Sequence, residues 1–275
     1  MANEVTTKKN DLPAHLAEYV KKSKLGNIDA TDQIIPRIKL IQAISPELQE
    51  YNDAKAGTFW HTVACETLGD RLAAIPIVIR KSYILWSPRS DERGILARAM
   101  DGIHWDAPNA EFTVKPKGSP GSVTYNTGNS VSESGLDKFG SSIPGDPQSL
   151  PAASLTYNML WYLPEFPQFS PSVIINTRSS VKPMQQLISK IESKPVEHFV
   201  QKYTIGVVQQ KGAEGPFFNY TYTADGYADE ELAHITKALY ERYAEMAWVA
   251  SEETSDTADD NRSTQFNEEK VAGKF

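Results

Sequence analysis

The sequence is poor in the features that mark several large classes of protein. Its 275 residues include one cysteine, Cys65, which excludes an internal disulfide framework and a thiolate cluster within one chain. No apolar run approaches the roughly 18 residues that a membrane-spanning helix needs. The first residues contain no apolar stretch of the kind found in secretory signals. We therefore expect a protein of a reducing compartment, the bacterial or host cytoplasm, without membrane association.

The chain also lacks an excess of positive charge. Lys and Arg number 28 against 35 Asp and Glu, a net charge of −7, which excludes a uniformly basic nucleic-acid-binding coat. Residues 225–275 carry 13 acidic and 5 basic side chains, whereas the preceding part of the chain is nearly neutral. We expect residues 250–275 to form a disordered acidic tail that ends at Phe275. Such a tail either keeps the protein in solution, competes for a basic groove or docks a partner protein.

Motifs for nucleotide binding and nucleophilic catalysis are missing. The sequence has no G-x-x-x-x-G-K-[ST] loop, no G-x-G-x-x-G turn after a strand and no G-x-S-x-G elbow. Of the five histidines only His61 lies close to another potential ligand, Cys65, and two ligands do not make a zinc site. Glu66 and Asp70 have a spacing that could hold Mg²⁺, but the residues between them indicate a turn. We predict no cofactor, no metal and no catalysis.

The sequence does contain a clear β-strand pattern. We interpret residues 1–33 as a polar N-terminal arm and residues 34–249 as a single domain. The strongest strand signal is residues 72–86, which are rich in β-branched and aromatic side chains. This stretch is either one long bent strand or two strands kinked near Pro76. An earlier strand is expected near residues 34–41.

Residues 114–151 differ from the rest of the domain because half of them are Gly, Pro or Ser. We interpret this segment as a long structureless excursion, functional or mobile, between two β blocks. The second block begins with strands near residues 155–162 and 172–177. A helix starting near residue 181 then buries one stripe of apolar side chains, namely Met184, Leu187, Ile188 and Ile191.

A hairpin and a final helix complete the predicted domain. The hairpin strands are residues 203–209 and 217–223. The helix spans about residues 229–249 and buries the stripe Leu232, Ile235, Leu239 and Tyr243. This order of elements implies few parallel crossovers. We therefore predict an α+β, mainly β fold, an OB-fold-like antiparallel β-barrel with attached helices.

Cations and aromatic side chains occur together on several of these strands. Alternate residues of a strand share a face, so Lys81 groups with Tyr83 and not with Arg80. One row of the hairpin is either core or a binding surface: Phe218, Tyr220 and Tyr222. An unpaired base stacks on an aromatic side chain for about 1–3 kcal/mol, and its phosphates attract cations. The candidate nucleic-acid-binding residues are Arg37, Lys39, Arg80, Lys81, Tyr83, Trp86, Arg89, Arg178, Tyr220 and Tyr222.

Parts of the chain resemble a bacteriophage protein family. Residues 36–42, PRIKLIQ, and the following Ser-Pro-Glu are similar to the opening of that family, as are residues 75–77 with Lys81 and Trp86. The family is that of phage-encoded single-stranded DNA-binding proteins with an OB-fold, and the likeness covers about residues 34–113 and 155–225. Some relatives carry cysteine pairs in the middle segment; this chain has none there, so no zinc knuckle is carried over.

The C-terminal tail resembles the acidic, aromatic-ending tails of bacterial and T7-type phage single-strand binders. This resemblance implies that Phe275 anchors replication or recombination partners. The sequence departs from the pattern at Lys270 and Lys274, which dilute the final acidic run.

We therefore expect a non-catalytic, largely sequence-independent single-stranded DNA-binding protein of phage replication or recombination, located in the cytoplasm of the bacterial host. Two alternatives stay open, a metal-dependent nuclease and a virion or host-takeover module that binds other proteins. The sequence does not decide between DNA and RNA. It also leaves open the site size, the oligomeric state, the identity of protein partners and the buried face of the hairpin.

Overall fold

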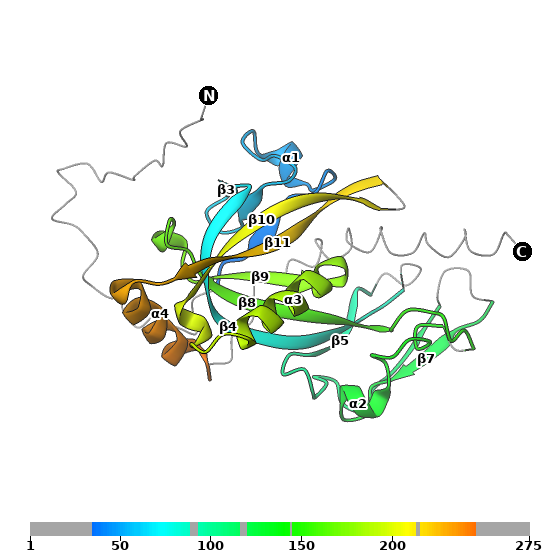
Figure 1. Ribbon diagram of the computed structural model, residues 1–275. Helices are drawn as coiled ribbons and strands as arrows, with labels where there is room; N and C mark the ends of the chain where they lie inside the picture. The colour runs from blue at the N-terminus through cyan, green and yellow to red at the C-terminus, as the bar shows by residue number, and fades with distance from the viewer. Residues whose placement is uncertain (1–34, 89–92, 116–119, 144, 213–214, 246–275) are drawn as a thin grey trace, which may run out of the picture. The chain divides into compact units, whose positions relative to one another are not determined.

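The computed structural model describes residues 35–88, 93–115, 120–143, 145–212 and 215–245 (Figure 1). Within these ranges the chain is mainly β, with antiparallel sheets and a few helices, as predicted. A small sheet has the order β1-β2-β3, formed by Ile38–Leu40, Phe59–His61 and Glu66–Gly69. The short helix α1, Glu47–Glu50, lies between β1 and β2 in the sequence.

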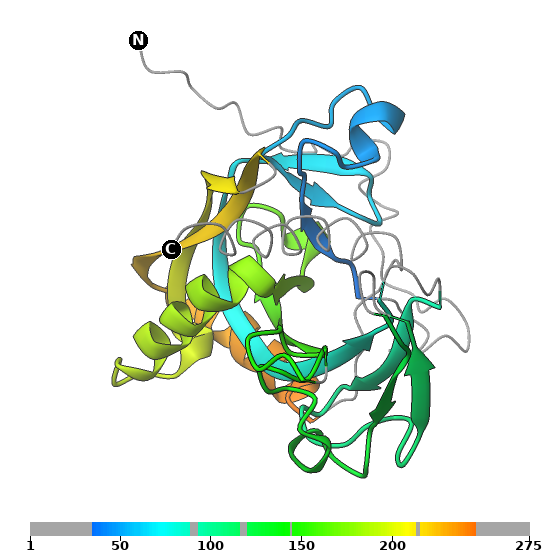
Figure 2. The same ribbon diagram turned by 90° about the vertical axis from the view of Figure 1, so that its right-hand side faces the viewer.

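The central sheet is built around β4, Arg71–Trp86, the strand with the strongest sequence signal. It is one strand of 16 residues, and the bend expected at Pro76 is a register shift between Pro76 and Val78. One edge of β4 pairs with β8, Ala153–Tyr162, which pairs in turn with β9, Ser172–Thr177. Figure 2 shows how strongly β4, in cyan, curves along its length.

The other edge of β4 is shared by two strands. Its first residues pair with β10, Gln201–Gly212, and its last residues pair with β5, Ile95–Ala99. Between them the short helix η5, His198–Val200, contacts β4, and the His198 ring lies 2.8 Å from the carbonyl oxygen of Ile77. The hairpin partner of β10 is β11, Gly215–Tyr227, which forms the edge of the sheet. The hairpin is longer than the sequence predicted.

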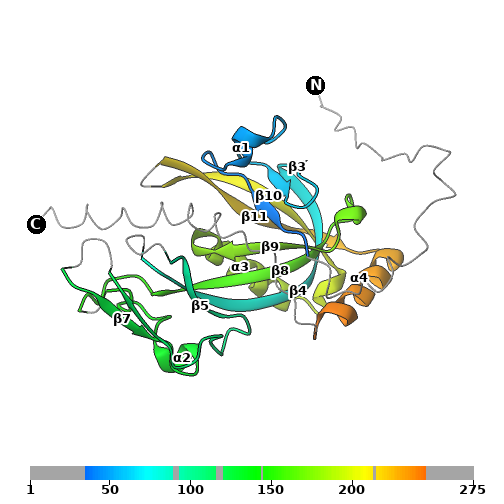
Figure 3. The same cartoon turned by 180° about the vertical axis from the view of Figure 1, so that it is seen from behind.

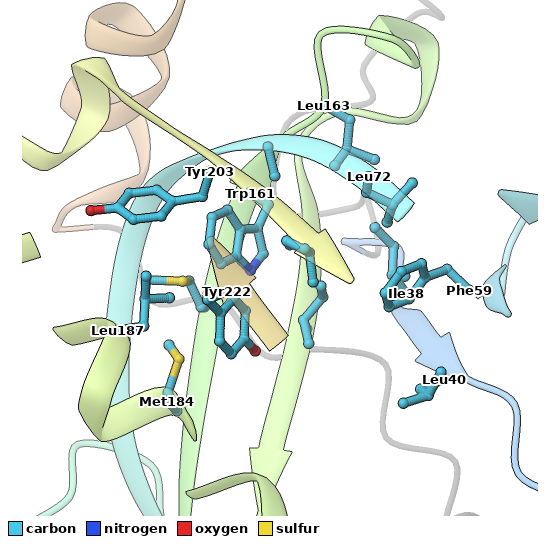
Figure 4. Packing of buried hydrophobic residues seen from close by; sticks show 14 of the residues in the cluster. Ile38, Leu40, Phe59, Leu72, Trp161, Leu163, Met184, Leu187, Tyr203 and Tyr222 are labelled. Carbon is cyan, nitrogen blue, oxygen red and sulfur yellow. The ribbon is translucent and has the colours of Figure 1, made fainter. Parts of the chain in front are cut away.

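A helix covers each face of this sheet. Met159 and Trp161 of β8 belong to the main core cluster. Helix α3, Val181–Glu192, contributes its buried residues Met184, Leu187 and Ile191 to the same cluster. Figure 4 shows Trp161, Leu187 and Met184 in this cluster. Leu160 and Tyr162 alternate with them and point to helix α4, Glu230–Tyr243. Figure 3 shows the sheet from behind, with α4 at one end.

Both helices begin where the sequence predicted, but α4 ends at Tyr243, before the expected residue 249. Helix α4 begins after Asp229, whose carboxylate accepts a hydrogen bond of 2.9 Å from the N–H of Leu232. Leu232, Leu239 and Tyr243 contact the core, but Ile235 is exposed because its side of the helix faces away from the sheet. Ser180 precedes α3 but does not cap it, since its hydroxyl donates to the carbonyl of Thr177.

The Gly-, Pro- and Ser-rich segment contains regular structure, so the prediction of a structureless excursion is wrong for its described residues. Strand β6, Glu111–Val114, pairs with β7, Val123–Asn126, and helix α2, Val131–Ser134, follows. They share a second buried cluster with β5 and the end of β4, which includes Tyr83, Trp105 and Tyr125. The sparse apolar residues of this segment therefore build a core of their own.

The expected OB-type barrel is not confirmed. Among the described residues the strands form three separate sheets, and no closed barrel is found. In the part of the chain that the structure describes, the strand pairing between β9 and the β1 region is a single bridge, between Arg37 and Val173. The described part of the chain is mainly β, with antiparallel sheets and a few helices.

Candidate nucleic-acid interface

A row of three polar side chains crosses the central sheet on the face that carries the main core. Lys81 on β4 lies directly opposite Tyr157 on β8, and Tyr157 lies directly opposite Asn176 on β9. Residues that are directly opposite each other in a sheet share a face. Lys81 is exposed, Tyr157 is half-buried and Asn176 is buried, so the row leads from solvent into the core. We call these three residues the Lys81 row.

Lys81 is held beside an aromatic ring. Its ammonium nitrogen lies 4.9 Å from the ring centroid of Tyr83, the neighbour that shares its face. A hydrogen bond that the Lys81 ammonium donates to the Tyr83 side chain raises the pKa of Lys81, and the nearby Tyr157 and Asp137 act in the same direction. The ammonium group therefore stays protonated at neutral pH, and the ring holds it in place.

The buried end of the Lys81 row is supported by the hairpin. The Tyr222 hydroxyl donates a hydrogen bond of 2.7 Å to the Asn176 side-chain oxygen. The Tyr222 ring is nearly parallel to Tyr220 at 6.3 Å and to Trp161 at 6.1 Å between centroids. Burial raises the pKa of Tyr222 well above its usual value, because the phenolate would lose its hydration. Tyr222 is therefore a core residue, whereas Tyr220 is half-buried.

Arg178 follows β9 directly, two residues after Asn176. It has a φ of +52°, in the left-handed region that costs a residue with a side chain some strain. Its neighbours fix this turn, because the Ser179 carbonyl accepts from the Asn219 amide at 3.1 Å. Arg178 as a whole is half-buried, and the turn that it begins, Arg178–Ser180, contacts β11, the strand that carries Tyr220.

Other predicted site residues are used elsewhere. The guanidinium of Arg80 donates to the carbonyls of Tyr243 and Ala244, at 3.2 and 3.1 Å, at the end of α4. Burial lowers its pKa, although the guanidinium stays charged. The ammonium of Lys39 is buried and lies 2.9 Å from the Glu47 carboxylate.

Four more residues complete the account of the predicted cations and rings. Arg37 is half-buried in the chain just before β1, and its backbone N–H donates to the Thr62 hydroxyl at 3.2 Å. Trp86 is half-buried at the end of β4 and pairs with Ile95. Arg89 and Phe275 lie outside the described residues. The structure therefore brings together Lys81, Tyr83, Tyr220, Tyr222 and Arg178 near one face, and it separates Lys39 and Arg80 from them.

The sequence analysis missed the residues that join this set. Tyr157 and Asn176 connect Lys81 to the hairpin. Strand alternation in residues 155–162 and 172–177 could have indicated the face on which each of them lies. It also missed Phe139, which is 72% exposed in the Gly-, Pro- and Ser-rich segment. An aromatic residue next to a lysine in such a segment was the available signal.

Metal-binding geometry is absent from the described ranges. Within them no three His, Cys, Asp or Glu side chains are grouped closely enough to hold a metal ion. His61 and Cys65 make separate contacts: His61 Nδ1 accepts from the N–H of Ala64 at 2.9 Å, and the Tyr51 hydroxyl donates to Cys65 Sγ at 3.4 Å. In the same ranges no helix is both long and apolar enough to cross a bilayer.

Comparisons with known proteins place the chain in a phage family. Searches of curated proteins and of solved structures gave no match. The family model described as Pam3 phage gp34-like protein matches residues 6–248, which is most of the chain. The chain therefore belongs to the Pam3 phage gp34-like protein family and is a bacteriophage protein.

Proposed function

We propose that this phage protein binds single-stranded DNA without catalysis and with little sequence preference, in replication or recombination. The supporting observation is the Lys81 row with its flanking residues. The exposed ammonium of Lys81 and the half-buried ring of Tyr157 lie on neighbouring strands, Tyr220 lies on the edge strand β11 of the same sheet, and Arg178 directly follows β9. This combination suits a chain that presents phosphates and unstacked bases at the same time.

The proposal assigns different tasks to the residues. Lys81 and Arg178 contact phosphates, since the Lys81 side chain is exposed and Arg178 follows β9 two residues after Asn176. Tyr157 and Tyr220 offer half-buried rings to bases. Tyr222 supports this surface from the core through its hydrogen bond to Asn176. A closed barrel is not required, since an open sheet with a cationic border can also hold an extended strand.

The proposal is tested by measuring the binding of oligo-dT to the full chain at several salt concentrations. Binding is monitored by the quenching of the fluorescence of its five tryptophans. The variant Lys81→Ala removes one cation from the row. A phosphate contact to single-stranded DNA contributes about 0.7 to the slope of log affinity against log salt. We expect the variant to lose about 0.7 of that slope and about fivefold in affinity at 0.1 M salt.

The matched control is Lys237→Ala, an exposed lysine on α4 that lies 3.8 Å from Glu241. This control should bind as the unmodified protein does. Salt-independent binding, no binding at micromolar protein, or equal losses in both variants would contradict the proposal.

A further inference from the structure

Phe139 is the most exposed large apolar side chain of the described residues, at 72%. An aromatic ring in water gains nothing for the fold, because its apolar surface is not removed from solvent. The next residue toward the N-terminus, Lys138, is also exposed. Such a pair indicates a contact made outside the fold.

The loop that carries Phe139 is held by hydrogen bonds on both sides of the ring. The Ser141 hydroxyl donates to the carbonyls of Leu136 and Lys138, at 2.9 and 2.6 Å. The N–H of Gly140 donates to the Ser149 carbonyl at 2.7 Å. The loop therefore presents Phe139 in a defined place, which lowers the entropy lost when the ring binds a partner.

This loop adjoins the face that carries Lys81. The carbonyl of Leu136 accepts from the N–H of Ala153 at 2.9 Å, at the start of β8. Two residues further along β8, Leu155 lies directly opposite Tyr83, the ring that holds Lys81. Asp137 is also close enough to Lys81 to affect its charge. Phe139 thus stands on the segment next to the cationic end of the row.

We propose that Phe139 stacks on an unpaired nucleobase of a single strand whose phosphates contact Lys81, with Lys138 as a second cation. This inference rests on the proposed function and deepens it, because it names a further residue that contacts the bases and not the sugar-phosphate chain. The exposed Lys138 beside Phe139 and the exposed Lys81 on the adjoining face favour a polyanion over an apolar protein surface. A stacked base contributes about 1–3 kcal/mol, which corresponds to at least about fivefold in affinity.

The experiment compares oligo-dT with an abasic oligonucleotide of equal length, in the unmodified protein and in Phe139→Ala. The unmodified protein should bind oligo-dT more tightly than the abasic strand. Phe139→Ala should lose about fivefold or more on oligo-dT and keep its affinity for the abasic strand. Phe139→Trp should retain oligo-dT binding, and its added tryptophan should be quenched. Ile103→Ala, 56% exposed in the same part of the fold, is the matched control and should change neither affinity.

The outcomes separate this inference from the proposed function. If the unmodified protein binds neither oligonucleotide, the proposed function fails and this inference fails with it. If the protein binds oligo-dT but Phe139→Ala binds both strands as before, the inference alone is overturned, and contact of Phe139 with a protein becomes the alternative. An equal loss on both strands also overturns it, because a stacking residue does not act on a strand without bases.

Discussion

Two adjacent cations, Arg80 and Lys81, have opposite tasks. Alternation along β4 sends them to different faces of the sheet. Lys81 is exposed and lies over Tyr83, whereas Arg80 binds the last carbonyls of α4. The sequence analysis separated their faces correctly but gave both a phosphate, because the helix that occupies Arg80 starts about 150 residues later in the chain.

Replacing Arg80 by Met should lower stability and leave DNA binding by the folded protein unchanged. The substitution keeps the aliphatic stem but removes two charge-assisted hydrogen bonds to carbonyls at a helix C-terminus. We expect a loss of about 1–2 kcal/mol in the free energy of unfolding, measured by urea denaturation. The control is Arg71→Met, an exposed arginine at the start of the same strand. Equal stability of the two variants would refute the capping role.

His61 should make the fold sensitive to mild acid. Its ring is buried, stacks on Phe169 at 4.4 Å between centroids, and accepts a hydrogen bond from Ala64 through Nδ1. Burial lowers the pKa of His61, because the imidazolium would lose its hydration. The unfolded chain binds a proton near pH 6.5 and the folded chain does so only at lower pH. Stability should therefore fall as the pH drops from about 6.5 toward that lowered pKa.

Urea denaturation at pH 7.5 and pH 5.5 measures this effect. The variant His61→Gln should be less stable than the unmodified protein at pH 7.5, because it lacks the stacked ring. Since Gln does not titrate, the variant should lose less stability than the unmodified protein between pH 7.5 and pH 5.5. The same pH dependence in both proteins would show that other groups cause it. Gln retains a hydrogen-bonding side chain, which limits the disturbance at Ala64.

At the scale of elements, the outer edge of β11 is closed by side chains. The side-chain amide of Gln42 donates to the Phe218 carbonyl at 3.0 Å and accepts from the Phe218 N–H at 2.8 Å, as a neighbouring strand would. In an edge strand, the backbone N–H and C=O groups of every second residue point away from the sheet. Of these, Pro216 has no N–H, and the carbonyl of Tyr222 accepts from Lys190 at 3.1 Å. Such occupation prevents pairing with another chain.

Gln42→Ala should loosen this edge. The substitution removes two hydrogen bonds to Phe218, so the free energy of unfolding should fall by about 1–2 kcal/mol. Hydrogen exchange of the β11 amides around Phe218 should become faster, and self-association at high protein concentration should increase. Gln49→Ala on α1 is exposed and serves as the control. Unchanged exchange in β11 would show that the Gln42 contact does not hold the edge.

The elements could be predicted where the signal is local. The long strand at residues 71–86, helix α3 with Leu187 in its buried stripe and the hairpin all follow from periodicity over a few residues. The segment of residues 114–151 could not, because its few buried residues, such as Tyr125, gain their partners from β5 and the end of β4. Strand propensity describes the local preference of a segment. Packing against residues that are distant in the sequence can outweigh this preference.

At the scale of the whole molecule, the assembly of the central sheet depends on pairings between strands that are distant in the sequence. The pairing of β10 with the start of β4 joins Tyr203 to Ala74, and no local pattern specifies that register. Whether β1 continues the central sheet depends likewise on a few contacts near Val173. The candidate site has the same origin, since the Lys81 row exists only after β4, β8 and β9 are in register. Strand alternation predicted the face of each residue but not its neighbours.

The distribution of charge over the whole chain supports a last prediction. Residues 251–275 contain seven acidic and three basic side chains, whereas the chain before residue 225 is nearly neutral. If the proposed DNA-binding face is cationic, this tail competes with DNA for it at a high local concentration. Deleting residues 251–275 should then tighten oligo-dT binding severalfold at low salt, and the gain should shrink as salt screens the attraction.

A full-length variant separates charge from length in that experiment. Replacing the seven acidic residues of the tail by Asn and Gln keeps the chain length and removes the negative charge. Competition by charge predicts that this variant binds oligo-dT as tightly as the deletion does. If the neutralised tail still weakens binding, the tail acts by bulk or through Phe275. If neither variant differs from the unmodified protein, the tail does not occupy the DNA-binding face, and its acidic residues must serve solubility or a partner protein.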